Sequence, residues 1–202
     1  MSNERNEVLG RLFLLWSAIC KMVVDGVRDA EEVANVLQGI VDGPANTARE
    51  VVHRLTRTLF PSITLGATTG REVLDARNVF VGYCDPAFTE AAEDESEGER
   101  ALDVKEMTEN GKFRQIFDGF GRRLDELAMS RSRITAFCRD HRDKLRGGGY
   151  GTFFLFKKGK KFFVASVRVV GSGRLGVRVS PLSGARVWYA TCQHRIVVPQ
   201  ES

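Results

Sequence analysis

Apolar residues recur at helical spacing through the first 60 positions of the chain. They are dense over residues 8–24, which predicts a largely buried helix. Over residues 29–41 they follow an i, i+3, i+4, i+7, i+8 pattern behind a capping-box-like start, which is typical of an amphipathic helix. A third helix is predicted over residues 46–60, stopped by Pro61. The pattern therefore predicts an N-terminal three-helix segment over residues 1–61.

From residue 62 onward the pattern changes to short, mixed elements. Helices are predicted over residues 113–120, where apolar residues are spaced three or four apart, and after Ser130, a residue typical of an N-cap. The acidic stretch at residues 89–100 has the composition of a mobile loop. Short strands are predicted over residues 62–66, 78–83 and 101–107.

The chain from residue 151 alternates between apolar and polar positions with a period of two. Four strands are predicted there, separated by turn-forming residues at 158–159, 171–173 and 183–184. A two-residue turn at Lys158-Gly159 would place Phe154 opposite Phe163. The expected fold class is therefore α+β: an N-terminal three-helix segment, then a mixed α+β domain over residues 62–202 that ends in a four-stranded antiparallel β-meander.

Composition narrows the class of protein. The chain has 202 residues and 43% hydrophobic residues, enough for an ample core. The longest apolar run, Leu12–Trp16, is far shorter than the ~20 residues of a membrane span, and no signal segment opens the sequence. Four widely spaced cysteines without a Cys-x-x-Cys pair indicate reduced thiols. We therefore expect a soluble cytoplasmic protein with no membrane partner.

Charge is distributed unevenly along the chain. The net charge is +4, but residues 142–202 contain 12 Lys and Arg against two acids, a charge of +10, and residues 1–141 carry −6. A basic segment of this kind indicates a polyanionic partner, either nucleic acid or an acidic protein surface. The alternative is internal: the acidic run at residues 90–100 neutralises the basic end of the same molecule.

The predicted meander carries the basic residues in two groups. Alternation places three arginines on the solvent side of the sheet, opposite an apolar face, and four lysines surround the first hairpin turn. Such a surface can follow a phosphate backbone. The candidate anion-binding residues are Lys157, Lys158, Lys160, Lys161, Arg168, Arg174 and Arg178.

The same residues have a simpler interpretation. Phe153 to Phe156 alternate between the two faces, so the strand is expected to be buried on both sides, and flanking lysines commonly protect such strands from aggregation. A two-sided apolar strand can also pair with a second copy of the chain, which makes a homodimer or a protein-interaction module the alternative function.

Metal binding and catalysis are weaker possibilities. If the helix after Ser130 covers the sheet, Cys138, His141, Cys192 and His194 have the ligand types of a structural zinc site, although buried cysteines are common in cores. A cysteine hydrolase would need Cys84 or Cys138 beside His141 or His194. The sequence has no nucleophile elbow, phosphate loop or metalloprotease motif, which favours a protein that is not an enzyme and needs no cofactor.

Several stretches resemble an uncharacterised family of hypothetical proteins predicted from genomes of uncultivated candidate-phyla bacteria. The resemblance covers residues 69–202 and extends to an earlier segment, VDGVRDAEEVANVLQGIVDG. It implies a cytoplasmic bacterial protein and implies no activity, cofactor or catalytic residue. The stretches that carry it are DARNVFVGYCDPAF, GKFRQIFDGFG, HRDKLRGGGYGTFFLFKKGKKFFVASVRVV and VWYATCQHRIVVPQ.

Overall fold

The computed structural model describes residues 55–90 and 94–201, with a few isolated positions before residue 55. The chain divides into two compact units, residues 1–50 and 51–202, and the sheet belongs to the second. The first two predicted helices lie outside the described residues. In the part of the chain that the structure describes, no helix is both long and apolar enough to cross a membrane.

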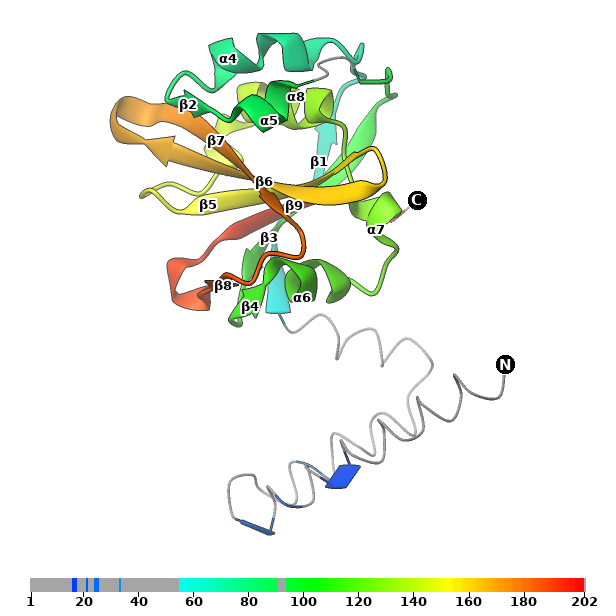
Figure 1. Cartoon of the computed structure of the whole chain (residues 1–202), viewed down its shortest axis with the longest axis vertical. Helices are drawn as coiled ribbons and strands as arrows, with labels where there is room; N and C mark the ends of the chain where they lie inside the picture. Colours follow the sequence, from blue (N-terminus) through cyan, green and yellow to red (C-terminus); the bar gives the residue numbers. More distant parts are fainter. Residues whose placement is uncertain are drawn as a thin grey trace, which may run out of the picture. The chain divides into compact units, whose positions relative to one another are not determined.

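A seven-stranded mixed sheet forms the centre of the second unit (Figure 1). Its neighbouring strands are antiparallel except for two parallel pairs, β9 with β5 and β7 with β2. A separate two-stranded ribbon pairs β4 (Gly111–Lys112) with β8 (Val187–Trp188). In spatial order the sheet strands are β1 (Thr56–Leu65), β3 (Arg100–Met107), β9 (Arg195–Pro199), β5 (Gly151–Lys158), β6 (Lys161–Val170), β7 (Arg174–Pro181) and β2 (Tyr83–Cys84).

The predicted four-stranded antiparallel meander is wrong. Three of its strands, β5, β6 and β7, do pair antiparallel in sequence order. The fourth segment instead crosses to the other side of β5, where β9 pairs parallel with it and antiparallel with β3. Period-two alternation identifies strands but does not identify their neighbours, and that is why the local pattern missed this insertion.

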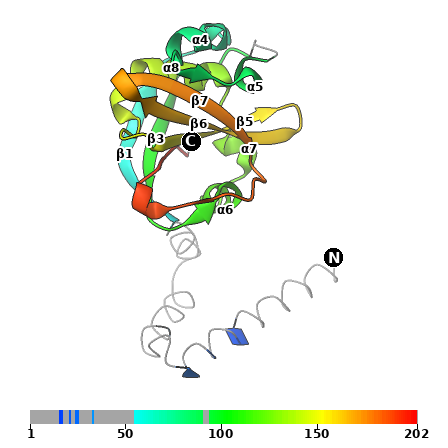
Figure 2. The same ribbon diagram turned by 60° about the vertical axis from the view of Figure 1, so that its left-hand side comes forward.

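Helices cover both faces of the sheet, and Figures 1 and 2 show α4, α5 and α8 on one side with α6 and the small ribbon on the other. Ser130 caps α8, because its Oγ accepts a hydrogen bond from Arg133 N at 3.1 Å, as predicted. The α-helices are α4 (Ala76–Val79), α5 (Pro86–Thr89), α6 (Phe113–Asp118), α7 (Leu124–Leu127) and α8 (Arg131–Asp140). The 3₁₀ segments are η2 (Glu72–Asp75), η3 (Arg142–Lys144), η4 (Gly171–Gly173) and η5 (Ala190–Cys192).

The prediction of a third helix is also wrong where the structure describes its C-terminal end. The expected fold class, which included a three-helix segment, is therefore wrong as well. Residues from Thr56 onward form β1, an edge strand that crosses the predicted boundary at residues 61 and 62. Pro61 does not stop a helix. It lies where the register with β3 shifts, beside Ser62 with a φ of 55°. Proline lacks an N–H and is tolerated in an edge strand at such an irregularity, so its position was compatible with either element.

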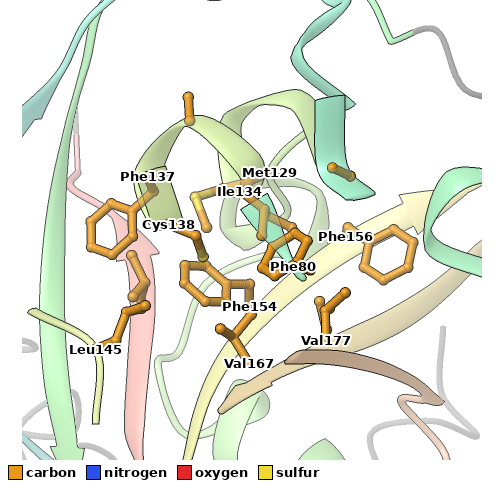
Figure 3. Close-up of a cluster of buried hydrophobic side chains, with 14 of the residues drawn as sticks. Phe80, Met129, Ile134, Phe137, Cys138, Leu145, Phe154, Phe156, Val167 and Val177 are labelled. Carbon is orange, nitrogen blue, oxygen red and sulfur yellow. The ribbon is translucent and has the colours of Figure 1, made fainter. Parts of the chain in front are cut away.

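The core consists of two clusters separated by the sheet. The first lies under α8 and includes Phe154 and Phe156, and Figure 3 shows these side chains with Phe137 and Cys138 of α8. The second lies under α6 and includes Phe153 and Leu155 of the same strand. The side chains of residues 153–156 are each 0% exposed, which confirms that this part of β5 is buried on both sides.

The internal position of β5 has two consequences for the sequence predictions. Its neighbours β9 and β6 already occupy both of its edges, so Phe153 to Phe156 give no reason to expect a homodimer. The hairpin register is also shifted by one turn position, since Phe156 rather than Phe154 lies opposite Phe163. The turn residues are Gly159 and Lys160, and Gly159 takes the positive φ of 60° that this turn requires.

Candidate anion-binding site

Two arginines of the sheet lie on the face that α6 and the small ribbon partly cover. Arg168 follows Ser166 by two residues on β6, and Arg178 of β7 lies directly opposite Ser166. The strand neighbours of Arg168 are glycines on both sides, Gly151 and Gly176. Neither glycine has a side chain, and the Phe153 ring lies over Gly151 while Tyr83 lies beside Gly176.

The walls of this site come from segments far away in the sequence. Trp188 of β8 packs in the second cluster, with its ring centroid 4.7 Å from Phe153 and 4.9 Å from Phe113. The guanidinium carbon of Arg186 lies 4.4 Å from the centre of the Trp188 ring. On the opposite side, Arg178 lies 5.3 Å from the Tyr83 ring. Both contacts have cation–π geometry, which orients these guanidinium groups.

Together these residues enclose a cleft of about 320 Å³, called here the arginine cleft. Asp85 is its one acidic lining residue among the residues described, and its two carboxylate oxygens accept hydrogen bonds from Ala87 N and Val179 N. The lining residues are Tyr83, Asp85, Phe113, Ser166, Arg168, Arg178, Val179, Ser180, Pro181, Gly184, Ala185, Arg186 and Trp188.

The electrostatics of the cleft are strongly positive. Burial lowers the pKa of Arg168, and the positive charges of Arg186 and Arg178 lower it further. Within the described ranges, none of these three arginines forms an ion pair or a hydrogen bond. Three like charges in one cleft repel one another, and an anion placed between them would remove that repulsion.

Two neutral groups in the lining also lack partners. Ser166 and Trp188 are each 5% exposed, and their Oγ and Nε1 atoms are buried without a hydrogen-bond partner in the described structure. Buried donors without partners are costly, at about 1–3 kcal/mol each, and are uncommon in folded proteins. Both atoms are closed to solvent, so the charged donors that a ligand in the cleft can reach are the three guanidinium groups.

His194 does not line the cleft but contacts Trp188, which does. Its Nδ1 accepts a hydrogen bond from Gly151 N at 3.0 Å, and its ring packs against Phe153 and Trp188. Burial lowers the pKa of His194 to about 4. The charges of Arg168, Arg146 and Arg186 add to this effect, against an opposing contribution from the Gly151 backbone. His194 is therefore neutral at physiological pH and adds no positive charge beside the cleft.

The sequence predicted this site in part. Arg168 and Arg178 lie together as the alternation indicated, but exposed Arg174 pairs in register with Val170 and is not part of the lining. Arg186 was missed, because it lies in the irregular segment before β8 and no periodic pattern identifies its neighbours. The one local signal was its position two residues before Trp188, a spacing that allows a cation–π contact.

The predicted lysine group has a different environment. Lys157 forms an ion pair with Asp125 at 2.6 Å, and Lys158 forms one with Glu90 at 2.6 Å. Lys160 and Lys161 are exposed at the hairpin tip. Internal acids therefore neutralise two of the four lysines, and the two groups of predicted basic residues do not form one surface.

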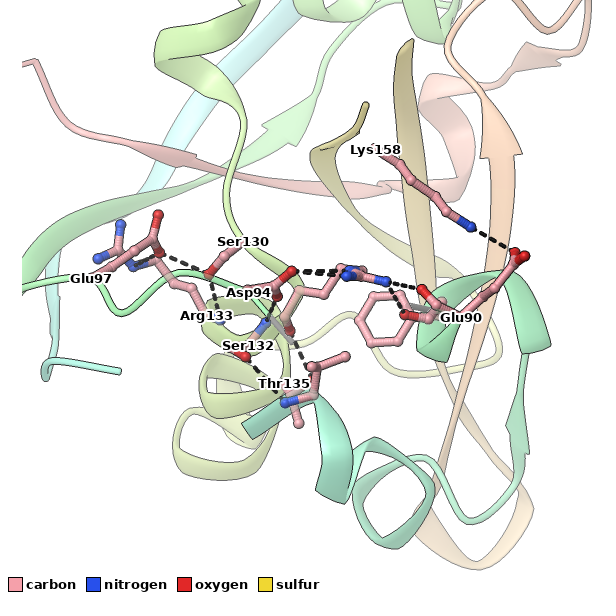
Figure 4. A network of polar contacts seen from close by, with 11 residues as sticks. Glu90, Asp94, Glu97, Ser130, Ser132, Arg133, Thr135 and Lys158 are labelled. Atoms are coloured by element: carbon pink, nitrogen blue, oxygen red, sulfur yellow. Dashed lines mark hydrogen bonds and ion pairs between the residues drawn. The ribbon is translucent and has the colours of Figure 1, made fainter. Parts of the chain in front are cut away.

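The described end of the acidic stretch is held in place, contrary to the prediction of a mobile loop. Figure 4 shows Asp94 and Glu97 beside the start of α8. Asp94 Oδ1 accepts from Arg131 at 2.9 Å, and Glu97 Oε2 lies 3.2 Å from Arg133 Nε. Here the acids neutralise buried arginines of α8 and leave the arginine cleft uncompensated.

The four candidate zinc ligands are not brought together. Cys138 is completely buried in the first cluster, whereas His194 contacts rings of the second cluster. Across residues 55–90 and 94–201 no group of three or more His, Cys, Asp or Glu is placed to hold a metal ion. Cys84, Cys138 and Cys192 are free thiols, and burial raises the pKa of Cys138, which disfavours the thiolate that a nucleophile needs.

The arrangement is suited to binding a compact anion. Guanidinium groups can form paired hydrogen bonds to phosphate or carboxylate oxygens. Nothing in the lining combines a nucleophile with a neighbouring base among the residues described. Comparisons with protein-family models, with curated proteins and with solved structures found no match for this chain.

Proposed function

We propose that the protein is a non-catalytic binding protein that engages a phosphate-bearing partner, nucleic acid first, through the arginine cleft. One observation carries this proposal: Arg168, Arg178 and Arg186 line one cleft, and among the described residues no acid forms an ion pair with them.

Phosphate suits this cleft better than carboxylate. A phosphate group has more acceptor oxygens than a carboxylate, and arginine recognises it with paired hydrogen bonds. Three guanidinium groups offer more N–H donors than one carboxylate can accept, since it has only two oxygens. An acidic protein surface is therefore the less favoured partner.

Nucleic-acid binding is tested by fluorescence anisotropy with the full chain and labelled single-stranded DNA and RNA at low and near-physiological salt. Affinity should fall steeply with salt, because bound phosphates release counterions. Replacing Arg178 or Arg186 by serine should weaken binding by roughly 10- to 100-fold, since each substitution removes a charged hydrogen bond worth about 1.5–3 kcal/mol.

Arg174→Ser is the matched control for these variants. Arg174 lies on the same strand as Arg178 and is also exposed, but it is outside the cleft. We expect its substitution to change affinity less than about threefold, the effect of a distant surface charge. Absence of binding at low salt, or equal losses in Arg174→Ser and Arg178→Ser, would contradict the proposal.

A further inference from the structure

We propose that the arginine cleft binds the terminal phosphate monoester of a nucleic-acid strand rather than the phosphodiesters along its backbone. This inference rests on the proposed function and specifies which part of the ligand the cleft recognises. Three features support it: the grouping of three arginines in one cleft, the charge that they match, and the acid in the lining.

Three arginines that form no ion pair among the described residues share one cleft, apart from the lysines of the hairpin tip. Arg168, Arg178 and Arg186 share the cleft, whereas Lys161 lies seven residues from Arg168 on β6, roughly 23 Å along an extended strand. Because the two positions are seven apart, an odd number, the Lys161 side chain lies on the opposite face of the sheet. On this face the cleft brings three arginines together, and Arg174 lies outside it.

The cleft matches a higher charge than a single phosphodiester carries. A phosphate monoester has a charge of about −1.5 to −2 at pH 7 and three terminal oxygens, whereas a diester has one negative charge and two such oxygens. Three guanidinium groups offer enough donors for three oxygens. The extra charge and oxygen of a monoester would both be used here.

One acid, Asp85, lies in the lining of the cleft and disfavours a second phosphate beside it. The Asp85 carboxylate accepts hydrogen bonds from Ala87 N at 3.0 Å and from Val179 N at 3.1 Å, so it is fixed in position. It lies in the lining together with Tyr83 and Arg178. A further phosphate beside Asp85 would be repelled, whereas a strand that ends in the cleft has no further phosphate on that side.

The test compares ends on one oligonucleotide sequence. Single-stranded DNA is prepared with a phosphate or a hydroxyl at the 5′ end and a fluorophore at the 3′ end, and a second pair has the phosphate or hydroxyl at the 3′ end with the label reversed. Anisotropy with the full chain should show at least tenfold tighter binding for a phosphorylated end than for its hydroxyl partner. Arg186→Ser should abolish this advantage, and Arg174→Ser should retain it.

The possible outcomes separate the two proposals. Equal affinity for phosphorylated and hydroxyl ends, with losses in the cleft variants, would overturn end recognition and leave phosphate-dependent binding of nucleic acid intact. No binding of any oligonucleotide at low salt would overturn both. Competition by thymidine 5′-monophosphate at the same affinity as the phosphorylated strand would identify a free nucleotide as the ligand and would also overturn recognition of a strand end.

Discussion

Replacing Asp94 by asparagine should destabilise the sheet-containing unit by about 3 kcal/mol. Arg131 is 6% exposed, and its Nε and Nη2 atoms donate to Asp94 Oδ1 at 3.2 and 2.9 Å. The second carboxylate oxygen accepts from Ser132 N at 2.8 Å. This one carboxylate therefore joins the acidic stretch to the first turn of α8. The substitution keeps the shape of the side chain and removes its charge.

The magnitude follows from what Arg131 retains. Removing one partner of a buried ion pair costs about 3–5 kcal/mol, because the other charge is left buried without compensation. Arg131 also donates to two backbone carbonyl groups, those of Glu90 at 2.6 Å and Phe88 at 3.3 Å. These acceptors remain in the variant, so the expected loss lies at the lower end of that range.

Urea denaturation followed by far-ultraviolet circular dichroism measures the effect, and Glu95→Gln is the matched control. Glu95 is adjacent in sequence and exposed, so its substitution should change the free energy of unfolding by less than about 0.5 kcal/mol. A loss below about 1 kcal/mol for Asp94→Asn with an unchanged m-value would refute the reasoning, since that is the contribution of a solvated surface pair.

Three further predictions concern stability. Phe154→Ala should lower the free energy of unfolding by about 3–5 kcal/mol in urea denaturation, because it opens a cavity between β5 and α8. The exposed control Tyr189→Ala should lower it by less than about 1 kcal/mol, and similar losses in the two variants would contradict the assignment of the core. Gly70→Ala should lower the free energy of unfolding by about 2 kcal/mol or more, since φ is +82° and a Cβ would lie 2.0 Å from Asp94 O. Gly66→Ala is the control, because a Cβ there would meet open space, and a neutral effect of Gly70→Ala would refute this reasoning. His194 should make stability fall as pH decreases from about 6.5 to about 4, because the unfolded chain binds a proton there that the folded chain excludes. This loss of about 2–3 kcal/mol in the free energy of unfolding should be absent in His194→Gln, and identical pH profiles of the two proteins would contradict it.

Local sequence patterns predicted the elements whose shape depends on their own residues. The strand over residues 101–107, the helix from Phe113 and the helix capped by Ser130 all form, because alternation, helical spacing and capping act within a few residues. The register of the β5–β6 hairpin was missed by one turn position, since Lys158-Gly159 and Gly159-Lys160 both supply a glycine to the turn.

Long-range pairing was less accessible. β9 pairs with strands that begin 95 and 44 positions earlier in the chain, at Arg100 and Gly151, and no local signal selects those partners. The arginine cleft was predicted only as far as it depends on alternation along β6 and β7. Arg186 and Tyr83 reach the cleft through tertiary packing, which no local pattern in the sequence indicates.

The position of β9 also sets an order for biosynthesis. Its partners β3 and β5 are made first, yet they are joined only through β9, the last strand of the sheet to be translated. While the nascent chain lacks residues 195–199, both partners have an open edge that can pair with another chain. The sheet therefore becomes continuous only after β9 has left the ribosome, and until then these edges are suitable substrates for a chaperone.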